Sequence, residues 1–207
     1  MSTRRGIGEN LPSVPDLLLT RLISGVAELT EPIAIGSADP PGGVGAALAV
    51  SLAATLAAAA AERSRTTWEE AGAVRAQAQT LRRRSLELAQ RDAAAHAEAR
   101  QRLGDRTGQS GDWQLGQAVS AAAQPLLDLA ACARDLAQLA ELLAGHAEGD
   151  VRPDAVVAAM LAAGGARAAG HLVEINLVVG ADDATLAGVQ DRVFEAETAA
   201  SAAGAIR

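Results

Sequence analysis

Residues 45–61 read GAALAVSLAATLAAAAA, an almost wholly apolar run that is interrupted only by Ser51 and Thr55. Alanine dominates it and has the highest helix propensity, because it loses no side-chain entropy on folding. Leucines recur every four residues, at 48, 52 and 56. A helix that is apolar all round belongs in a protein interior, so we expect this one to be buried near the centre of the fold. The run is shorter than the roughly 20 residues that a membrane-spanning helix needs, so we do not expect it to span a membrane.

The rest of the chain has the same helical character. Alanine accounts for 51 of the 207 residues, and the only aromatic rings of Trp or Phe are Trp68, Trp113 and Phe194. Strands favour aromatic and β-branched residues, so this composition favours helices. Apolar spacing predicts helices over residues 16–30, 44–62, 67–103, 112–143, 154–179 and 183–203. Pro125 is expected to kink or divide the fourth of them.

These helices predict an all-α fold, an antiparallel bundle of about six helices. Residues 1–15 contain two glycines and two prolines with little periodicity, and we interpret them as a loose arm. Residues 16–207 would then form a single bundle domain. Alanine-rich faces left outside such a bundle favour association, and we expect a homodimer.

Charge and cysteine content exclude several classes of function. The formal net charge is -7, and all 18 basic residues are arginine. An acidic chain without a dense basic face is a poor candidate for binding nucleic acid. A single cysteine, Cys132, allows neither an intrachain disulfide nor a cysteine-ligated zinc site, and the three histidines lack zinc spacing. The first residues lack the apolar run of a signal peptide, so we expect a cytoplasmic protein without a metal.

A proline- and glycine-rich segment precedes the apolar helix, with residues 40–48 reading PPGGVGAAL. Gly42 and Gly43 let the backbone approach a ligand closely, and the free amides at the following helix start suit an anion. The chain has no lysine, so this is not a P-loop. The alternative is a tight turn whose glycines only allow helices to pack.

Asp92 and His96 form a second candidate pair. Spacings of three and four place Asp92 on the same apolar seam as Ser85 and Leu88. A carboxylate there must find a partner or stay protonated. His96 is one helical turn further on, and an Asp–His pair facing a cleft can act as general acid or base. The alternative is a structural pair at the edge of the core.

Two polar residues lie within the fifth predicted helix, one at its start and one near its end. Asn176 lies in its most apolar part and needs partners for up to four hydrogen bonds, from a neighbouring helix or from a ligand. Asp154 follows Pro153 and suits a helix cap or a first-turn acid.

Taken in order, these segments resemble the formiminotetrahydrofolate cyclodeaminase family, which includes bacterial methenyltetrahydrofolate cyclohydrolases. The resemblance extends over residues 16–200. Residues 40–47 resemble the family's Pro-Gly-Gly-Gly-Ser loop, and residues 92–96 resemble its Asp-x-x-Ala-aromatic motif. Residues 121–126 resemble its Ala-x-x-x-Pro-Leu turn. The segment from Asp154 through Asn176-Leu177 resembles its Asp-opened helix ending in Asn-Leu.

The resemblance implies an all-α homodimer that binds a reduced folate in a cleft beside the glycine-rich loop. In cyclodeamination N10 attacks the N5-formimino carbon and ammonia leaves; in the cyclohydrolase reaction water adds to the methenyl bridge. Neither reaction needs a metal or a redox cofactor. Gly42 and Gly43 would cradle the ligand, Asp92 with His96 would transfer protons, and Asn176 and Asp154 would be substrate-binding residues.

The sequence also departs from the family pattern. Pro41 stands before Gly42, and Val44 occupies the position of the family's serine, which removes a hydroxyl. His96 replaces the usual aromatic residue. These changes favour an alternative, a non-catalytic paralogue that keeps the bundle and the folate cleft. A third interpretation is an alanine-rich scaffold without a small-molecule site.

Overall fold

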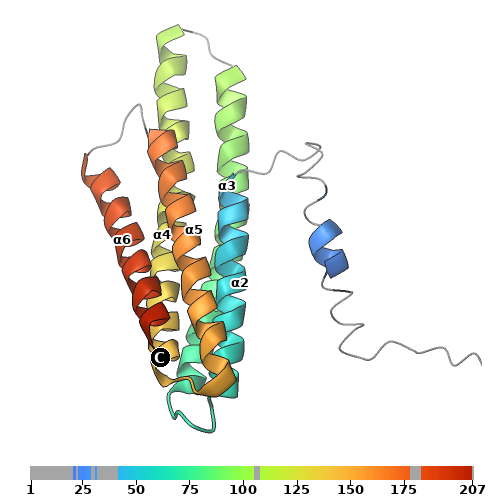
Figure 1. The fold of residues 1–207 in the computed structure, drawn as a ribbon. Coiled ribbons are helices and arrows are strands. Elements are labelled where there is room, and N and C mark those ends of the chain that lie inside the picture. Colours follow the sequence, from blue (N-terminus) through green and yellow to red (C-terminus); the bar gives the residue numbers. More distant parts are fainter. Residues whose placement is uncertain are drawn as a thin grey trace, which may run out of the picture. The chain divides into compact units, whose positions relative to one another are not determined.

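The structure is a computed structural model that describes residues 21, 23–28, 31, 42–104, 108–177 and 183–206. Residues 42–206, as far as described, form five long helices and one short 3-10 helix (Figure 1). They are α2 (Gly42–Arg63), α3 (Ala71–Gly104), α4 (Gly108–His146), η1 (Gly149–Val151), α5 (Arg152–Leu177) and α6 (Asp183–Ala205). No described residue belongs to a strand, so the predicted all-α fold is confirmed.

The chain divides into two compact units, residues 1–40 and residues 41–207. In the first unit residues 23–28 are helical, within the helix predicted over residues 16–30. The predicted boundary after residue 15 lies outside the described residues and stays a prediction, as does the structure of Pro40 and Pro41. All further description concerns the second unit.

The fourth predicted helix differs from its prediction at Pro125. Helix α4 runs without a break from Gly108 to His146, so Pro125 does not divide it, and the kink that was the other expectation stays a prediction. Proline removes one backbone hydrogen bond of the helix and crowds the preceding turn. The apolar side of α4 is buried on the C-terminal side of Pro125, at Leu126, Leu129 and Leu136, and this packing stabilises the helix across it.

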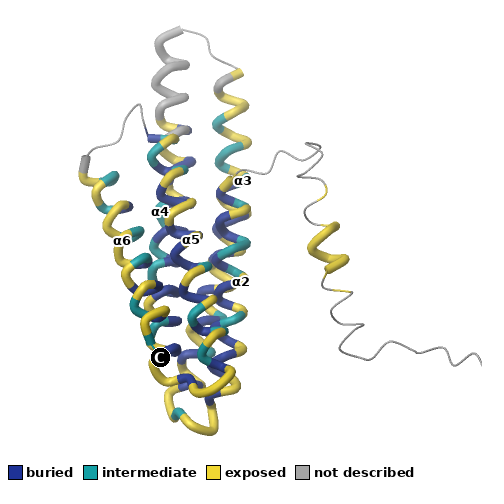
Figure 2. The backbone as a smooth tube through the Cα atoms, in the orientation of Figure 1, coloured by how far each residue is buried: buried dark blue, intermediate teal, exposed yellow. Residues whose placement is uncertain are grey.

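Four of the helices pack as a bundle in which α2 lies beside α3 and α5, and α4 lies beside the same two helices. Helix α6 covers α4 and α5. Helices α3 and α4 continue beyond the start of α2, at the upper end of the view in Figure 1. Figure 2 shows the buried residues along the inner sides of the helices. Most of them are alanines, whose small side chains let the helix axes come close together.

Helix α2, which the sequence places near the centre of the fold, packs against α3, α4 and α5 and is buried on the side that faces them. Its alanines face the bundle, and Ala47, Ala53 and Ala54 are fully buried. The leucines recur on the opposite side, where Leu52 is 54 % exposed. Short side chains allow α3, α4 and α5 to pack closely against α2, and the wider leucines are therefore left on its outward side.

Helix α2 and the segment Gly149–Leu177 have the length and hydropathy of membrane-spanning helices. That criterion uses length and composition alone, and the core helices of bundles also meet it. About half of each apolar stretch is buried against the other helices.

Polar contacts hold the end of the bundle where α2 finishes. The guanidinium of Arg63 forms ion pairs with the carboxylates of Asp150 and Asp154. In the same region the rings of Trp68 and His146 stack, with centroids 4.3 Å apart and planes inclined by 9°. These contacts join the α2–α3 connection to the connection between α4 and α5.

Helices α2 and α5 come very close together at Gly165. A Cβ atom there would clash with the Val50 Cγ2 atom, and it would lie 3.5 Å from the carbonyl oxygen of Ala46. Val50 is fully buried, and a β-branched side chain in a helix has essentially one χ1 rotamer, so it cannot turn aside. Gly164, its neighbour in sequence, is exposed with no atom near its Cβ position.

This contrast gives a matched pair of variants. Both Gly164→Ala and Gly165→Ala gain helix propensity, by about 1 kcal/mol. Only Gly165→Ala overpacks the α2–α5 contact, at a cost of about 1–3 kcal/mol. We expect urea denaturation to show Gly164→Ala more stable than the wild type, and Gly165→Ala less stable than Gly164→Ala by the overpacking cost. Equal stability of the two variants would contradict the close α2–α5 packing.

Candidate functional site

Asp92 lies on the buried seam of α3, as its spacing predicts. The seam residues Ser85 and Leu88, two turns and one turn before it, are buried, and Asp92 itself is only 6 % exposed. The seam positions Ala95 and Ala99 beyond it are half-buried, because α3 there continues past the start of α2. Asp92 is therefore the last fully buried residue of the seam and lies at the edge of the covered core.

The start of α2 packs directly against this carboxyl group. A Cβ atom at Gly43 would clash with Asp92 Oδ2, and it would lie 2.7 Å from both Asp92 Cγ and Leu126 Cδ2. Only glycine fits at position 43 with these neighbours in place. Helices α2, α3 and α4 thus meet at Gly43, Asp92 and Leu126, and this group of three residues is the candidate site.

The carboxyl group of Asp92 is incompletely satisfied. Its Oδ2 atom is buried, and no donor among the described residues forms a hydrogen bond with it. Burial raises the pKa of Asp92 above its usual value, and the nearby charge of His96 opposes that shift. A buried carboxyl group with a raised pKa and a free oxygen keeps its proton to a higher pH than an ordinary carboxyl group does, and it can exchange that proton with a ligand.

The predicted glycine loop is in fact the first turn of α2, which begins at Gly42. The first N–H groups of an α-helix have no partner inside the helix, and they lie at the positive end of its dipole. Gly42 is exposed, and a Cβ atom on it would lie 3.3 Å from the Leu172 side chain of α5. The backbone amides at the start of α2 therefore lie close to Asp92 on one side and to α5 on the other.

Asn176 belongs to the same end of the bundle. It is half-buried in the last turn of α5, one turn beyond Leu172, which packs against Gly42. The structure thus brings Gly42, Gly43, Asp92, His96 and the end of α5 that carries Asn176 to one end of the bundle. Sequence reasoning did not place Leu126 or Leu172 there, since apolar spacing shows that a residue is buried but not which helix it meets.

Asp154 lies away from this group. It is in the first turn of α5, and its Oδ2 atom is 3.1 Å from Arg63 Nη1. At 1.5 Å per residue, the helix separates it from Asn176 by about 33 Å. A site built on Gly43 and Asp92 therefore does not include Asp154, which acts instead as a first-turn acid and ion-pair partner.

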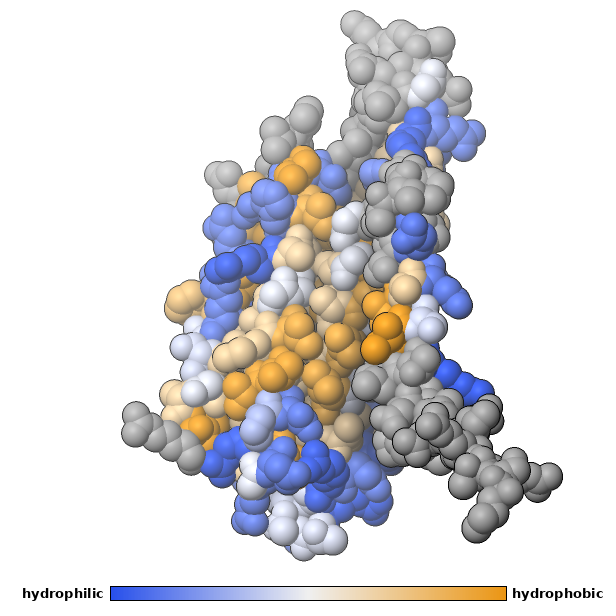
Figure 3. All heavy atoms as spheres, turned by 45° about the vertical axis from the view of Figure 1, so that its right-hand side comes forward, coloured by the Kyte–Doolittle hydropathy of each residue, from blue (hydrophilic) through white to orange (hydrophobic). Residues whose placement is uncertain are grey.

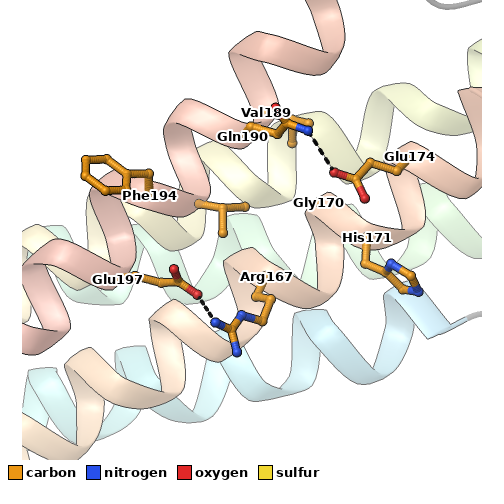
Figure 4. A pocket seen from close by; sticks show the side chains of 9 residues that line it. Arg167, Gly170, His171, Glu174, Val189, Gln190, Phe194 and Glu197 are labelled. Carbon is orange, nitrogen blue, oxygen red and sulfur yellow. Dashed lines mark hydrogen bonds and ion pairs between the residues drawn. The ribbon is translucent and has the colours of Figure 1, made fainter.

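A separate pocket of about 400 Å³ lies between α5 and α6 (Figure 4). It contains His171, and it is crossed by the ion pair of Arg167 with Glu197 and by a hydrogen bond from Gln190 to Glu174. Its floor includes Gly170 and Val189. Neither Asp92 nor Gly43 lines it, so His171 lies outside the candidate site.

The remaining candidates for reactive groups are structural. Cys132 is buried, its thiol donates to the Leu81 carbonyl oxygen at 3.5 Å, and burial raises its pKa to about 11. A thiol with that pKa is a poor nucleophile, as expected for a small core residue. Among the described residues no three His, Cys, Asp or Glu side chains gather in a way that could hold a metal ion. The absence of a metal stays a prediction.

Comparison with known proteins agrees with this fold. The helical fold matches the crystal structure of formiminotetrahydrofolate cyclodeaminase from Thermotoga maritima with a TM-score of 0.72 and 20 % sequence identity. The match covers 81 % of this chain and 87 % of that chain. At this identity it shows a shared fold. A search of curated proteins finds no match.

The sequence itself matches the model of one protein family over most of its length. The matched segment, residues 25–195, contains the start of α2, the whole of α3 with Asp92 and His96, and the end of α5 with Asn176. The chain belongs to the formiminotransferase-cyclodeaminase family.

Proposed function

We propose that this chain is an enzyme of folate one-carbon metabolism that acts on formimino- or methenyl-tetrahydrofolate, as a cyclodeaminase or a cyclohydrolase, in the cytoplasm. The observation that carries the proposal is the buried carboxyl group of Asp92, whose Oδ2 atom lacks a partner and which lies against the glycine start of α2. The family and the shared fold support the same assignment.

The reaction class explains the use of such a carboxyl group. In either reaction a nucleophile adds to the one-carbon unit, a tetrahedral carbon forms, and a nitrogen gains or loses a proton as a bond breaks. A carboxyl group whose pKa is raised by burial can supply or accept that proton. Asp92 is the proposed proton carrier; burial raises its pKa, and His96, one turn away, opposes that shift. No metal or redox cofactor is needed.

The other residues would bind and orient the folate. The amides at Gly42 and Gly43 offer donors at the positive end of α2, where an oxygen or a negative charge is stabilised. The side-chain amide of Asn176 can pair with the donor and acceptor groups of a pterin ring. Leu126, which is buried, and Leu172 pack against the α2 start and hold it in place.

One sequence feature favours a second candidate, a non-catalytic paralogue that binds folate. Val44 is half-buried in the first turn of α2, where the family pattern has a serine hydroxyl. The two candidates differ in turnover but not in binding. Loss of methenyl-tetrahydrofolate absorbance, measured with purified protein beside calorimetric folate binding, separates them. Binding without turnover, with turnover gained by Val44→Ser, would favour the paralogue, and absence of binding would exclude both.

Asp92→Asn tests the proton carrier. The amide keeps the shape of the carboxyl group but cannot transfer a proton, so turnover should fall by about 10²–10⁴-fold while folate binding is largely retained. The control is Asp128→Asn, the same change at a half-buried carboxyl group that already pairs with Arg91 at 3.5 Å. That variant should keep wild-type turnover. Wild-type turnover in Asp92→Asn would remove Asp92 from the mechanism.

The raised pKa of Asp92 also predicts how stability depends on pH. The folded chain keeps this proton above the ordinary carboxyl pKa of 3.8, where the unfolded chain releases it. The Asp92 contribution to the free energy of unfolding therefore decreases as pH rises from that value through the higher folded-state pKa, and then levels off. Urea denaturation across this range should show Asp92→Asn gaining stability relative to the wild type as pH rises. A constant difference between the two proteins would show that the pKa is not raised.

Gly43→Ala tests the glycine start of α2. The added Cβ atom would displace the Asp92 carboxyl group or the Leu126 side chain, so folate binding and turnover should both fall, with a stability loss of about 1–3 kcal/mol. The control is Gly72→Ala in α3, where no atom lies near the Cβ position. It should match the wild type in binding and turnover. Normal binding and turnover in a folded Gly43→Ala protein would place the folate elsewhere.

A further inference from the structure

The pocket between α5 and α6 is a cavity that the proposed folate site does not use. Its volume of about 400 Å³ lies in the range of sites for small molecules. Figure 3 shows a band of apolar side chains on the face of the molecule that this view brings forward. Apolar surface alone does not distinguish one ligand from another. The α5–α6 pocket can do so, because charged and apolar side chains line it together (Figure 4).

Two polar contacts between the helices mark the ends of this pocket. At one end Arg167 Nη2 of α5 lies 2.5 Å from Glu197 Oε1 of α6. At the other end Gln190 Nε2 of α6 donates to Glu174 Oε1 of α5 at 3.3 Å. The two contacts are seven residues apart on each helix, so about 10 Å of helix lies between them. The pocket is therefore a slot with a charged group at each end.

The floor of the slot is apolar and closed. Val189 is fully buried, and a Cβ atom at Gly170 would lie 2.8 Å from Val193 Cγ2, so the two helices leave no gap there. Phe194 also lines the pocket, and at 70 % exposure it is the most exposed large apolar side chain among the described residues. A ligand with an apolar body would lie on the valines and cover part of this ring.

One carboxylate of the pocket has no cationic partner among the described residues. Arg167 and Glu197 neutralise each other, whereas Glu174 accepts a hydrogen bond only from the neutral amide of Gln190. His171, one turn before Glu174, forms no ion pair with it in the described part of the chain. Glu174 is half-buried, so water solvates its charge only in part. An ammonium group would form charge-assisted hydrogen bonds with it.

A metal ion or an anion fits this pocket less well. In the described residues no three His, Cys, Asp or Glu side chains gather as metal ligands would. An anion would have to break the contact of Arg167 with Glu197. It would also enter a pocket that is already negative, because one arginine and two glutamates line it. An ammonium group leaves the ion pair intact and neutralises the remaining charge.

We propose that the α5–α6 pocket binds small primary amines that carry an apolar body. The ammonium group lies at Glu174, and the body extends over the valine floor towards Phe194. Phe194 is one helical turn from Gln190, the hydrogen-bond partner of Glu174, which is about 6 Å along α6. 2-Phenylethylammonium separates its nitrogen from its ring by about that distance and is the probe. The proposal does not depend on the folate reaction.

The single phenylalanine of the chain reports on this pocket directly. In ¹⁵N-labelled protein that contains ring-¹³C-labelled phenylalanine, all phenylalanine ring signals in NMR spectra belong to Phe194. Titration with 2-phenylethylammonium should shift them saturably, with a Kd of about 1 mM or below. The indole N–H signal of Trp68 is the control. Trp68 stacks on His146 outside the pocket, so its signal should not shift.

Two further ligands separate the contributions of charge and apolar body. 2-Phenylethanol has the same body without the charge, and methylammonium has the charge without the body. Each should bind about tenfold more weakly than the probe or not at all, since each loses one of the two contacts.

Glu174→Gln tests the carboxylate. The amide keeps the shape of the side chain and its contact with Gln190 but removes the charge, so the Kd of the probe should rise about tenfold or more. The control is Glu141→Gln, the same change at a half-buried carboxylate of α4 outside the pocket. That variant should bind the probe as the wild type does. Unchanged helical circular dichroism in both variants excludes unfolding as the cause.

Any of four results would overturn the proposal. The first is no saturable shift of the Phe194 signals with the probe at up to about 10 mM. The second is equal binding of 2-phenylethanol, which would reduce the pocket to an apolar hollow. The third is equal binding of methylammonium, which would show only the attraction of cations to a chain of net charge -7. The fourth is a wild-type Kd in Glu174→Gln. Folate binding and turnover are measured separately, so failure of either proposal leaves the other to its own tests.

Discussion

The close approach of α2 to its neighbours is the constraint on which the rest of the structure depends. Gly43 touches Asp92 and Leu126, and Gly165 touches Val50, with no space for a further carbon atom at either glycine. Fully buried alanines fill most of the remaining contact surface. Each small side chain buries little apolar area, so the bundle gains its stability from many short contacts at close packing density. One added methyl group is therefore felt across two helices.

The same close packing creates the candidate site. Asp92 would be solvated if α2 began one turn later, and its carboxyl group would have an ordinary pKa. Because Gly43 lacks a side chain, the start of α2 covers the carboxyl group and excludes water from Oδ2. A buried acceptor without a donor costs free energy, and such costs in native proteins are concentrated at functional sites. The site thus combines a buried carboxyl group that lacks a hydrogen-bond donor among the described residues with the N-terminal end of a helix.

Packing by alanine also explains the outward leucines. A helix with leucines on its inner side would keep α3 and α5 further away, and Gly43 could not reach Asp92. The wide side chains are instead on the outward side of α2, where Leu52 is 54 % exposed. The tight inner packing of α2 and its apolar outer side are therefore two consequences of one arrangement.

The sequence alone determined the helices, since alanine content and three-four spacing act within one or two turns. It also determined that Asp92 lies on a buried seam, because that position follows from the period of a single helix. Only the tertiary structure decided which helices meet at each position. Residue spacing does not show that Gly43 rather than Val44 touches Asp92, that Asp154 pairs with Arg63 far from the site, or that α4 continues through Pro125. A helix that is apolar all round carries no signal for which side faces inward. The alanine side of α2 became the inner side because close packing favours small residues. That preference depends on contacts between helices and not on the sequence of one helix.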